Sequence, residues 1–128
     1  MSAGERIDPM GMALEAAEAA AARGEVPVGA VIVRQGAVLA VAGNRTLADL
    51  TGHDLYVTLE PCAMCAGAIS FARIRRLYFA ASDEKGGAVE NGPRFFAQPT
   101  CHHAPEVYGG IRASEAAAQL TDFFKQRR

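Results

Sequence analysis

The sequence predicts an α/β fold in which helices pack on a mostly parallel sheet, and three observations support this prediction. Short runs rich in β-branched and other apolar residues alternate along the chain with segments of helical periodicity. Glycine and proline residues mark the boundaries between these segments. Half of the 128 residues are hydrophobic, which is enough for one core, so we expect a single domain over residues 1–128.

An alanine-rich helix is the first predicted element, and two strands follow it. Asp8-Pro9 is typical of an N-cap and the first helical position, and Gly24 of the residue just past a helix end. Residues 26–33 predict a strand with apolar residues on both faces, as in the centre of a sheet. Gln35-Gly36 then turns the chain into a second strand at 38–42. The helix is expected to bury an apolar stripe made of Met12, Ala16, Ala19 and Ala20.

The second half of the chain continues this alternation. The further predicted elements are strands at 55–59, 76–81 and 106–107, and a helix from Cys62 to about Phe71. Residues 82–105 contain several glycines and prolines and predict a long loop, and loops of this length are usually functional or mobile. Ser114 is expected to cap a C-terminal helix whose apolar face consists of Ala116, Leu120, Phe123 and Phe124.

The stretch Glu60-Pro61-Cys62-Ala63-Met64-Cys65 carries the clearest chemical signal, because a strand leads directly into a Pro-Cys-x-x-Cys that begins a helix. Two thiols three residues apart on the first turn face the same way and can share one metal ion. The positive end of the helix dipole favours the thiolate, which is the form that binds zinc. A redox dithiol is the alternative, but redox motifs usually place proline between the cysteines. The pattern therefore favours a metal.

Composition and charge exclude only a few classes of function. The net charge is −1, so contact with nucleic acid has to come from local basic patches. Two candidates are the tail at 125–128 and the cluster of Arg73, Arg75 and Arg76, and both are equally well explained as ordinary solvated charge. Three cysteines suit a reducing compartment better than a disulfide framework, and no apolar run has the length of a membrane span. We therefore expect a soluble cytoplasmic protein.

Several segments together resemble one known family. Residues 55–68 read L-Y-V-T-L-E-P-C-A-M-C-A-G-A and are close to its signature almost residue for residue. Further matching segments lie at 24–31, 43–45, 80–88 and 122–124. The chain resembles the tRNA adenosine deaminases of bacteria, which are members of the cytidine-deaminase-like zinc superfamily.

The resemblance implies a three-layer α/β/α fold with a mixed five-stranded sheet, a Zn²⁺ cofactor, a tRNA anticodon loop as partner and a homodimer. In the family, one His and two Cys hold the zinc, and a Glu two residues after the His moves protons during attack on C6 of adenine. Cys62 and Cys65 correspond to the two cysteine ligands. By resemblance, Asn44 contacts the flipped nucleoside, Val28 lines the base pocket, and Phe124 lies on the helix that approaches the flanking nucleotides.

The chain departs from the family at one place, because it has no His-x-Glu and so no assignable catalytic residue. His53 is followed by Asp54 and Leu55, and the other two histidines come after the cysteines. In the family, a segment with this motif and most of a helix joins the second and third strands, whereas residues 45–54 alone join them here. Ten residues span at most about 33–36 Å, enough to cross the first strand. We expect a bare patch of sheet, lower stability and more aggregation than in the relatives.

Other residues are weak replacements for the missing ones. His53 is more simply interpreted as a polar residue at the start of a strand than as a ligand. Cys101-His102-His103 has metal-binding residue types but lies on the long loop, where substrate contacts or loop structure are the better interpretation. Glu60 is interpreted as a structural hydrogen-bond acceptor and not as a proton shuttle.

The leading functional interpretation is zinc-dependent deamination of adenosine to inosine at the tRNA wobble position, with weak or no activity in this deleted chain. One alternative is a deaminase of a free base or nucleoside, such as guanine or cytosine. Another is a non-catalytic relative that binds RNA or a partner chain, which the missing glutamate favours. A redox protein comes last.

Overall fold

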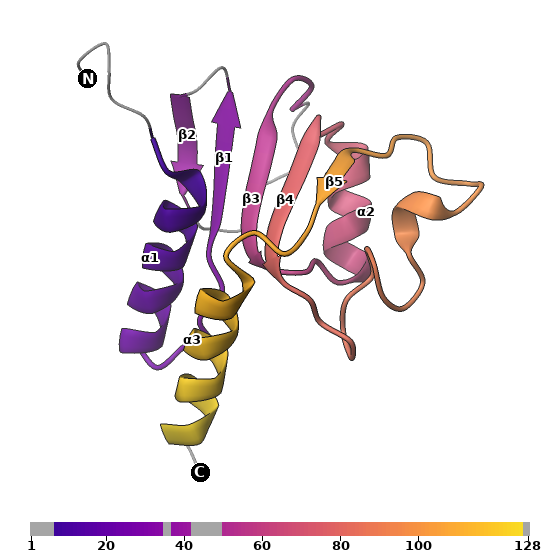
Figure 1. Cartoon of the computed structure of the whole chain (residues 1–128). Coiled ribbons are helices and arrows are strands. Elements are labelled where there is room, and N and C mark those ends of the chain that lie inside the picture. The colour runs from indigo at the N-terminus through magenta and orange to yellow at the C-terminus, as the bar shows by residue number, and fades with distance from the viewer. Residues whose placement is uncertain (1–6, 35–36, 42–49, 127–128) are drawn as a thin grey trace.

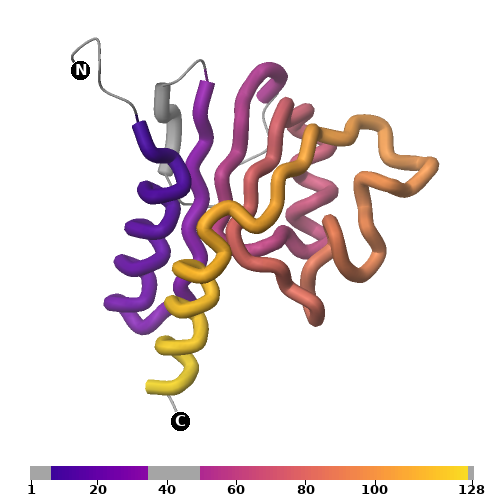
Figure 2. Tube along the Cα trace, in the orientation of Figure 1, coloured from indigo at the N-terminus to yellow at the C-terminus, as the bar shows by residue number. Residues whose placement is uncertain are grey.

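The computed structural model describes residues 7–34, 37–41 and 50–126, and within them a sheet lies between two layers of helices (Figure 1). Helices α1 and α3 cover one face of the sheet, and α2 covers the other, next to β3, β4 and β5 (Figures 1 and 2). The elements are α1 (Pro9–Ala22), β1 (Ala30–Arg34), β2 (Ala37–Val41), β3 (Asp54–Leu59), α2 (Ala63–Phe71), β4 (Arg76–Ala81), the 3₁₀ helix η1 (Phe95–Ala97), β5 (Glu106–Tyr108) and α3 (Ala113–Gln126). The expected three-layer α/β/α arrangement is therefore confirmed.

The sheet has the strand order β2-β1-β3-β4-β5 and is mixed. Strand β1 is antiparallel to both of its neighbours, β2 and β3, whereas β3, β4 and β5 run parallel. The sheet is thus evenly mixed, and the expectation of a mostly parallel sheet holds only for its second half. Strands β2 and β3 flank β1 and run in the same direction, as the resemblance implied.

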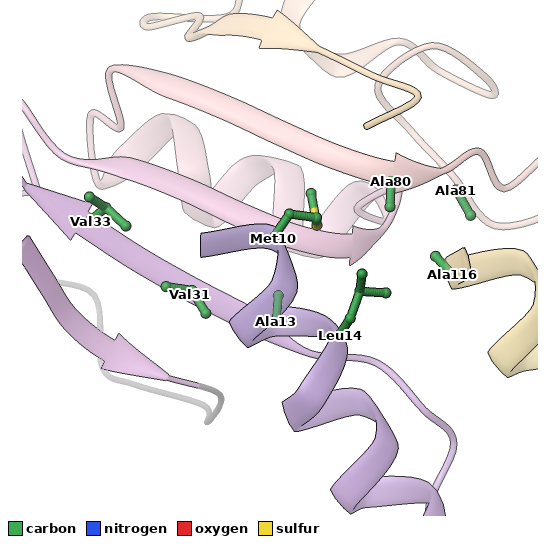
Figure 3. Packing of buried hydrophobic residues seen from close by; sticks show 8 residues of the cluster. All are labelled: Met10, Ala13, Leu14, Val31, Val33, Ala80, Ala81 and Ala116. Carbon is green, nitrogen blue, oxygen red and sulfur yellow. The ribbon is translucent and has the colours of Figure 1, made fainter. Parts of the chain in front are cut away.

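The core on the α1 side joins helices α1 and α3 to strands β1 and β4 (Figure 3). Its buried members are Met10, Ala13, Leu14, Val31, Val33, Ala80, Ala81 and Ala116. Of the predicted stripe on α1, Ala20 is buried and Met12 packs against this core while only partly buried, whereas Ala19 is exposed and Ala16 is only partly buried. Nearly every residue of this helix is apolar, so periodicity alone does not select a face. The larger side chains of Met10 and Leu14, four residues apart, select it by filling the space over β1.

Most predicted boundaries agree with the structure to within one or two residues, and the start of β1 does not. The strand predicted at 26–33 begins only at Ala30, because Pro27 has no N–H to donate and the chain before Ala30 passes close to α1. Helix α3 begins at Ala113, so Ser114 lies inside the helix and is not its cap. Phe124 was also placed wrongly on the apolar face, since it is 50% exposed while Phe123 is buried. The turn predicted at Gln35-Gly36 lies outside the described residues.

The sheet face opposite α1 is covered unevenly. Helix α2 packs there through Ile69 and Ala72 against Leu77 and its neighbours. On β1, Val31 and Val33 are buried under α1, whereas Ile32 points to the other face and is only half-buried. The described residues thus leave part of β1 accessible, in keeping with a shortened connection between β2 and β3. No described helix has the length and apolarity that crossing a membrane requires.

Gly29 is expected to tolerate no side chain. Its N–H donates to Thr58 Oγ1 at 3.0 Å, its carbonyl accepts from the Thr58 N–H at 3.0 Å, and a Cβ here would overlap the Ala13 carbonyl oxygen of α1. We expect Gly29→Ala to destabilise the protein by about 1–3 kcal/mol, because either α1 or the β1–β3 pairing has to move. Urea unfolding measures this. The control is Gly67→Ala, whose Cβ would meet Phe95 at an ordinary 3.6 Å, and an equal loss in both variants contradicts the prediction.

Candidate functional site

The two cysteines of the C-x-x-C lie where β3 passes into α2, at one end of the sheet. Cys62 is the N-cap of α2, with φ −74° and ψ 176°, and Cys65 lies on its first turn. Both thiols are free and exposed. The extended Cys62 backbone lets the chain leave the strand and begin the helix, and no side-chain hydrogen bond caps that helix.

The pKa values of the two thiols are shifted in opposite directions. Hydrogen bonds from the backbone N–H of Cys65, and less strongly from the Cys65 thiol and the Met64 N–H, lower the pKa of Cys62 against the opposing effect of burial. Burial raises the pKa of Cys65, and the hydrogen bond to Cys62 and the charge of that residue raise it further. Of the two thiols, Cys62 is therefore the one that loses its proton more readily.

Glu60 connects this turn to the loop that follows β4. Its side chain is 2% exposed. Its oxygens accept hydrogen bonds from the backbone N–H groups of Asp83 (3.0 Å), Val89 (3.0 Å), Glu90 (2.9 Å) and Asn91 (3.0 Å), and from Asn91 Nδ2 (2.7 Å). Burial raises the pKa of Glu60, but these donors outweigh it, and the net effect is a lowered pKa. With its lone pairs occupied, Glu60 is a structural acceptor, as the sequence indicated.

The same loop is tied to the cysteine turn by its backbone. The Ala88 N–H donates to the Pro61 carbonyl at 2.9 Å, and the Phe95 N–H donates to the Ala88 carbonyl at 2.7 Å. Glu60 and these bonds hold residues 83–95 beside the N-terminus of α2. Sequence reasoning singled out Glu60 but missed Asn91, which has no motif around it and meets Glu60 only through the fold.

His53 lies at the opposite end of β3 from the cysteines. The strand has six residues, so about 20 Å separates its two ends. The ring is buried, and its Nδ1 lies 3.0 Å from the Leu50 carbonyl oxygen and 3.1 Å from that of Thr51. His53 therefore holds the turn before β3 and is too far away to complete a metal site with Cys62 and Cys65.

The Cys101-His102-His103 segment lies at the other end of α2. Ser70, near the end of that helix, donates its hydroxyl to the His103 carbonyl at 2.6 Å, and His103 Nε2 donates to the Ile74 carbonyl at 2.8 Å. The Cys101 thiol donates to the His103 carbonyl at 3.2 Å. Since eight residues of helix rise about 12 Å, these groups are remote from Cys62. Their hydrogen bonds hold the long loop against the end of α2, which agrees with the structural interpretation of this segment and not with that of a substrate contact.

The residues present do not fit a complete catalytic zinc centre. Such a centre needs three protein ligands and an open position. All three histidines and all three cysteines lie in the described part of the chain, and no group of three or more His, Cys, Asp or Glu side chains suited to a metal occurs there. The structure brings together the two thiols that the sequence predicted and adds no third donor to them.

The residues predicted to contact substrate differ in their placement. Val28 is 42% exposed and precedes Gly29, which pairs with Thr58 near the end of β3. It therefore lies at the same end of the sheet as the cysteines. Phe124 is exposed on α3, which extends toward that end (Figure 1). Asn44 lies outside the described residues, and β2, which precedes it, also finishes at this end because Val41 pairs with Val31.

Two surfaces away from the cysteine pair are poorly suited to RNA. The predicted basic cluster is largely neutralised, because Arg75 forms a bidentate pair with Asp54 (2.9 and 3.0 Å) and Arg76 bonds Glu106 (2.7 Å). A groove of about 420 Å³ between α1 and α3 contains the carboxylates of Glu18, Glu115 and Asp122 in its lining, which repel phosphate. Of the predicted basic tail, residues 127–128 lie outside the described residues.

Known proteins resemble the chain closely. The profile of the MafB19-like deaminase family matches residues 46–128. The tRNA-specific adenosine deaminase of Agrobacterium fabrum is 54% identical over 147 aligned residues, which cover 97% of each chain. That of Rickettsia bellii is 40% identical over 141 residues, with 91% of this chain and 97% of the relative covered.

A solved structure from work on A-to-I editing by tRNA:A34 deaminases at the wobble position superposes with a TM-score of 0.83. It is 53% identical, and the match covers 88% of this chain and 98% of that one. The alignment with the Agrobacterium fabrum protein spans more positions than this chain has residues. The relative therefore contains residues with no counterpart here, as an internal deletion between β2 and β3 predicts.

Proposed function

Because the chain belongs to the family of tRNA-specific adenosine deaminases, we propose that its partner is a tRNA whose anticodon loop presents adenosine at the wobble position. The reaction served by this lineage is hydrolytic deamination of that adenosine to inosine. The observation that carries the proposal is the 54% identity over nearly the whole of both chains, together with the β3–α2 turn that places Cys62 and Cys65 side by side. We place the protein in the cytoplasm, as one domain that forms a homodimer.

Zinc is part of this proposal only as a partial site. Cys62 and Cys65 supply two thiol donors of the type that zinc prefers, and both are accessible. The chain has no His-x-Glu to add the third ligand and the proton shuttle. We therefore propose that the 128-residue chain keeps the fold and part of the recognition surface of the family, and that deamination by the chain alone is below detection.

Base recognition is proposed at the cysteine end of the sheet. Val28 is exposed beside the end of β3, and the bonds of Glu60 hold residues 83–91 on the other side of the cysteine turn. Phe124 offers an exposed ring on α3 on which a neighbouring base can stack. Asn44 is proposed to contact the nucleoside from the segment that follows β2.

A non-catalytic role is the second candidate function, and one observation favours it. The chain lacks His-x-Glu, and binding an anticodon loop needs neither a third zinc ligand nor a proton shuttle. In this role the chain binds the same RNA as its relatives and leaves the adenosine unchanged.

The proposal is tested with an anticodon stem-loop that carries adenosine at the wobble position. We expect the reduced chain, supplied with zinc, to bind this RNA more tightly than the same stem-loop with uridine there, and to form no inosine detectable by mass spectrometry. Val28→Glu is expected to weaken binding by about tenfold or more, because it places a negative charge beside the base and phosphates. Val26→Glu is the matched control, at a similarly exposed position two residues earlier. Equal binding of both RNAs, or turnover of free adenosine, contradicts the proposed substrate.

A further inference from the structure

The pair Asn91-Gly92 lies in the loop that Glu60 holds beside the start of α2. The chain's other asparagine, Asn44, precedes an arginine, so Asn91 is the only asparagine that a glycine follows. In such a pair the backbone nitrogen of the second residue can attack the side-chain carbonyl carbon of the first, because glycine has no Cβ to obstruct the approach. Asn91 is only partly buried, so water can reach it. Both reactants of asparagine deamidation are therefore present at this position.

Three hydrogen bonds fix Asn91 in the folded chain. Its Nδ2 donates to Glu60 Oε1 at 2.7 Å, and its backbone N–H donates to Glu60 Oε2 at 3.0 Å. Its carbonyl accepts from the Arg94 N–H at 3.2 Å. Two of these bonds have a carboxylate as acceptor and belong to the stronger class of hydrogen bond. Because deamidation releases Nδ2 as ammonia, the bond from Nδ2 to Glu60 has to break before the reaction can finish.

We propose that Asn91 is a deamidation site that Glu60 protects, and that its reaction permanently opens the loop over residues 83–95. The Gly92 nitrogen forms a bond to Asn91 Cγ, and the Cγ–Nδ2 bond breaks. Ammonia leaves with the proton of the Gly92 N–H, which gives a succinimide. Water then adds to either carbonyl of this ring and opens it to aspartate or isoaspartate, so no oxidant or reductant takes part. This inference does not depend on the proposed RNA substrate.

The product cannot restore the bonds that the asparagine made. An aspartate at position 91 has no side-chain N–H to donate, and it places a second negative charge against Glu60, whose side chain is 2% exposed. Like charges this close repel strongly where water is excluded. The same loop is tied to the cysteine turn by the Ala88 N–H, which donates to the Pro61 carbonyl. Deamidation therefore loosens the support of the cysteine turn and, unlike thermal opening of the loop, is not reversed.

The test measures deamidation in the purified full chain without RNA, by peptide mapping and by enzymatic methylation of isoaspartate. We expect Asn91 in the folded parent chain to react at least about tenfold more slowly than in the same chain unfolded in urea, because bonds to a charged acceptor hold its amide. Asn91→Gln is expected to remove the isoaspartate from this peptide. Equal rates in the folded and unfolded chains overturn the proposal, because they show that the fold gives Asn91 no protection.

A matched pair of variants separates Glu60 from overall stability. Glu60→Gln keeps the size of the side chain and removes its charge, and we expect it to raise the rate at Asn91 in the folded chain at least about tenfold. The control is Gly29→Ala, which disturbs α1 and β1 and leaves the partners of Asn91 in place. Equal acceleration in both variants contradicts a role for Glu60. Circular dichroism identifies a variant that fails to fold, and the comparison of the folded with the unfolded parent chain then decides.

The proposed opening of the loop has its own measurement. Asn91→Asp reproduces one product, and Asn91→Ala removes the amide without adding a charge. Hydrogen exchange at the Val89 amide, which donates to Glu60 at 3.0 Å, is expected to accelerate more in Asn91→Asp than in Asn91→Ala. The same exchange rate in both variants contradicts the proposed effect of the second charge. RNA binding enters none of these experiments, so failure here is distinguishable from failure of the proposed function.

Discussion

Replacing residues 45–54 with the longer corresponding segment of the Agrobacterium fabrum relative is expected to raise inosine formation in an anticodon stem-loop by at least about 10³-fold. Removal of a positioned proton-transfer group alone costs about 10²–10⁴-fold, and a catalytic zinc site also needs its third protein ligand. The described structure already places Cys62 and Cys65 at the end of β3, and β2 finishes at the same end of the sheet. The segment therefore inserts where its ligand is needed. The measurement is initial rate at saturating zinc.

Two controls show whether the gain comes from the restored site. Changing the glutamate of the inserted segment to glutamine is expected to remove most of the gain while zinc still binds. Adding Cys62→Ser to the restored chain is expected to remove both the gain in inosine formation and the binding of zinc. The restored chain is further expected to hold one zinc per chain, because the inserted histidine adds the third protein ligand to Cys62 and Cys65. A chain that binds zinc in this ratio and shows no increase in turnover would falsify the view that the missing segment is what the chain lacks.

Glu60→Ala is expected to lower the free energy of unfolding by about 3–5 kcal/mol. The substitution leaves four backbone N–H groups and one side-chain amide without their acceptor, in a place where water is excluded. Urea unfolding gives the magnitude. Hydrogen exchange at the amides of Val89 and Asn91 is expected to accelerate more than exchange in β1. The control is Glu90→Ala, a neighbouring exposed carboxylate, which is expected to change stability by less than about 0.5 kcal/mol.

Glu60 also predicts how stability depends on pH. The pKa of this carboxyl is lower in the folded protein than its ordinary value of 4.5, so its contribution is fully present above about pH 4.5. That contribution is lost as the pH falls through the lower pKa of the folded state. Glu60→Gln is expected to be less stable than the parent chain at neutral pH and to lose less stability on acidification. Parallel stability profiles from pH 7 to pH 3 would show that Glu60 makes no such contribution.

Local chemistry explains which elements were predictable from the sequence. Asp8 caps α1 as expected, since its carboxylate accepts from the Gly11 N–H at 3.0 Å, and Gly24 follows the helix with φ +83°. The limits of β4 agree with the prediction, because a compact apolar run ends there at Ser82-Asp83. The cysteine pair was predictable for the same reason, since its geometry depends on one helical turn. The residue at which β1 begins was not predictable from the sequence, because it depends on how closely α1 approaches Gly29.

By itself, the sequence determined the fold class, the C-x-x-C at the start of α2 and the absence of His-x-Glu, because each of these depends on residues near one another along the chain. Only the tertiary structure decided which face of α1 is buried, that His53 and His103 lie too far from the cysteines to act as ligands, and that Asn91 bonds Glu60. These outcomes depend on distances between segments far apart in sequence. Pairing and packing of the sheet set those distances, and no local pattern of residues contains them.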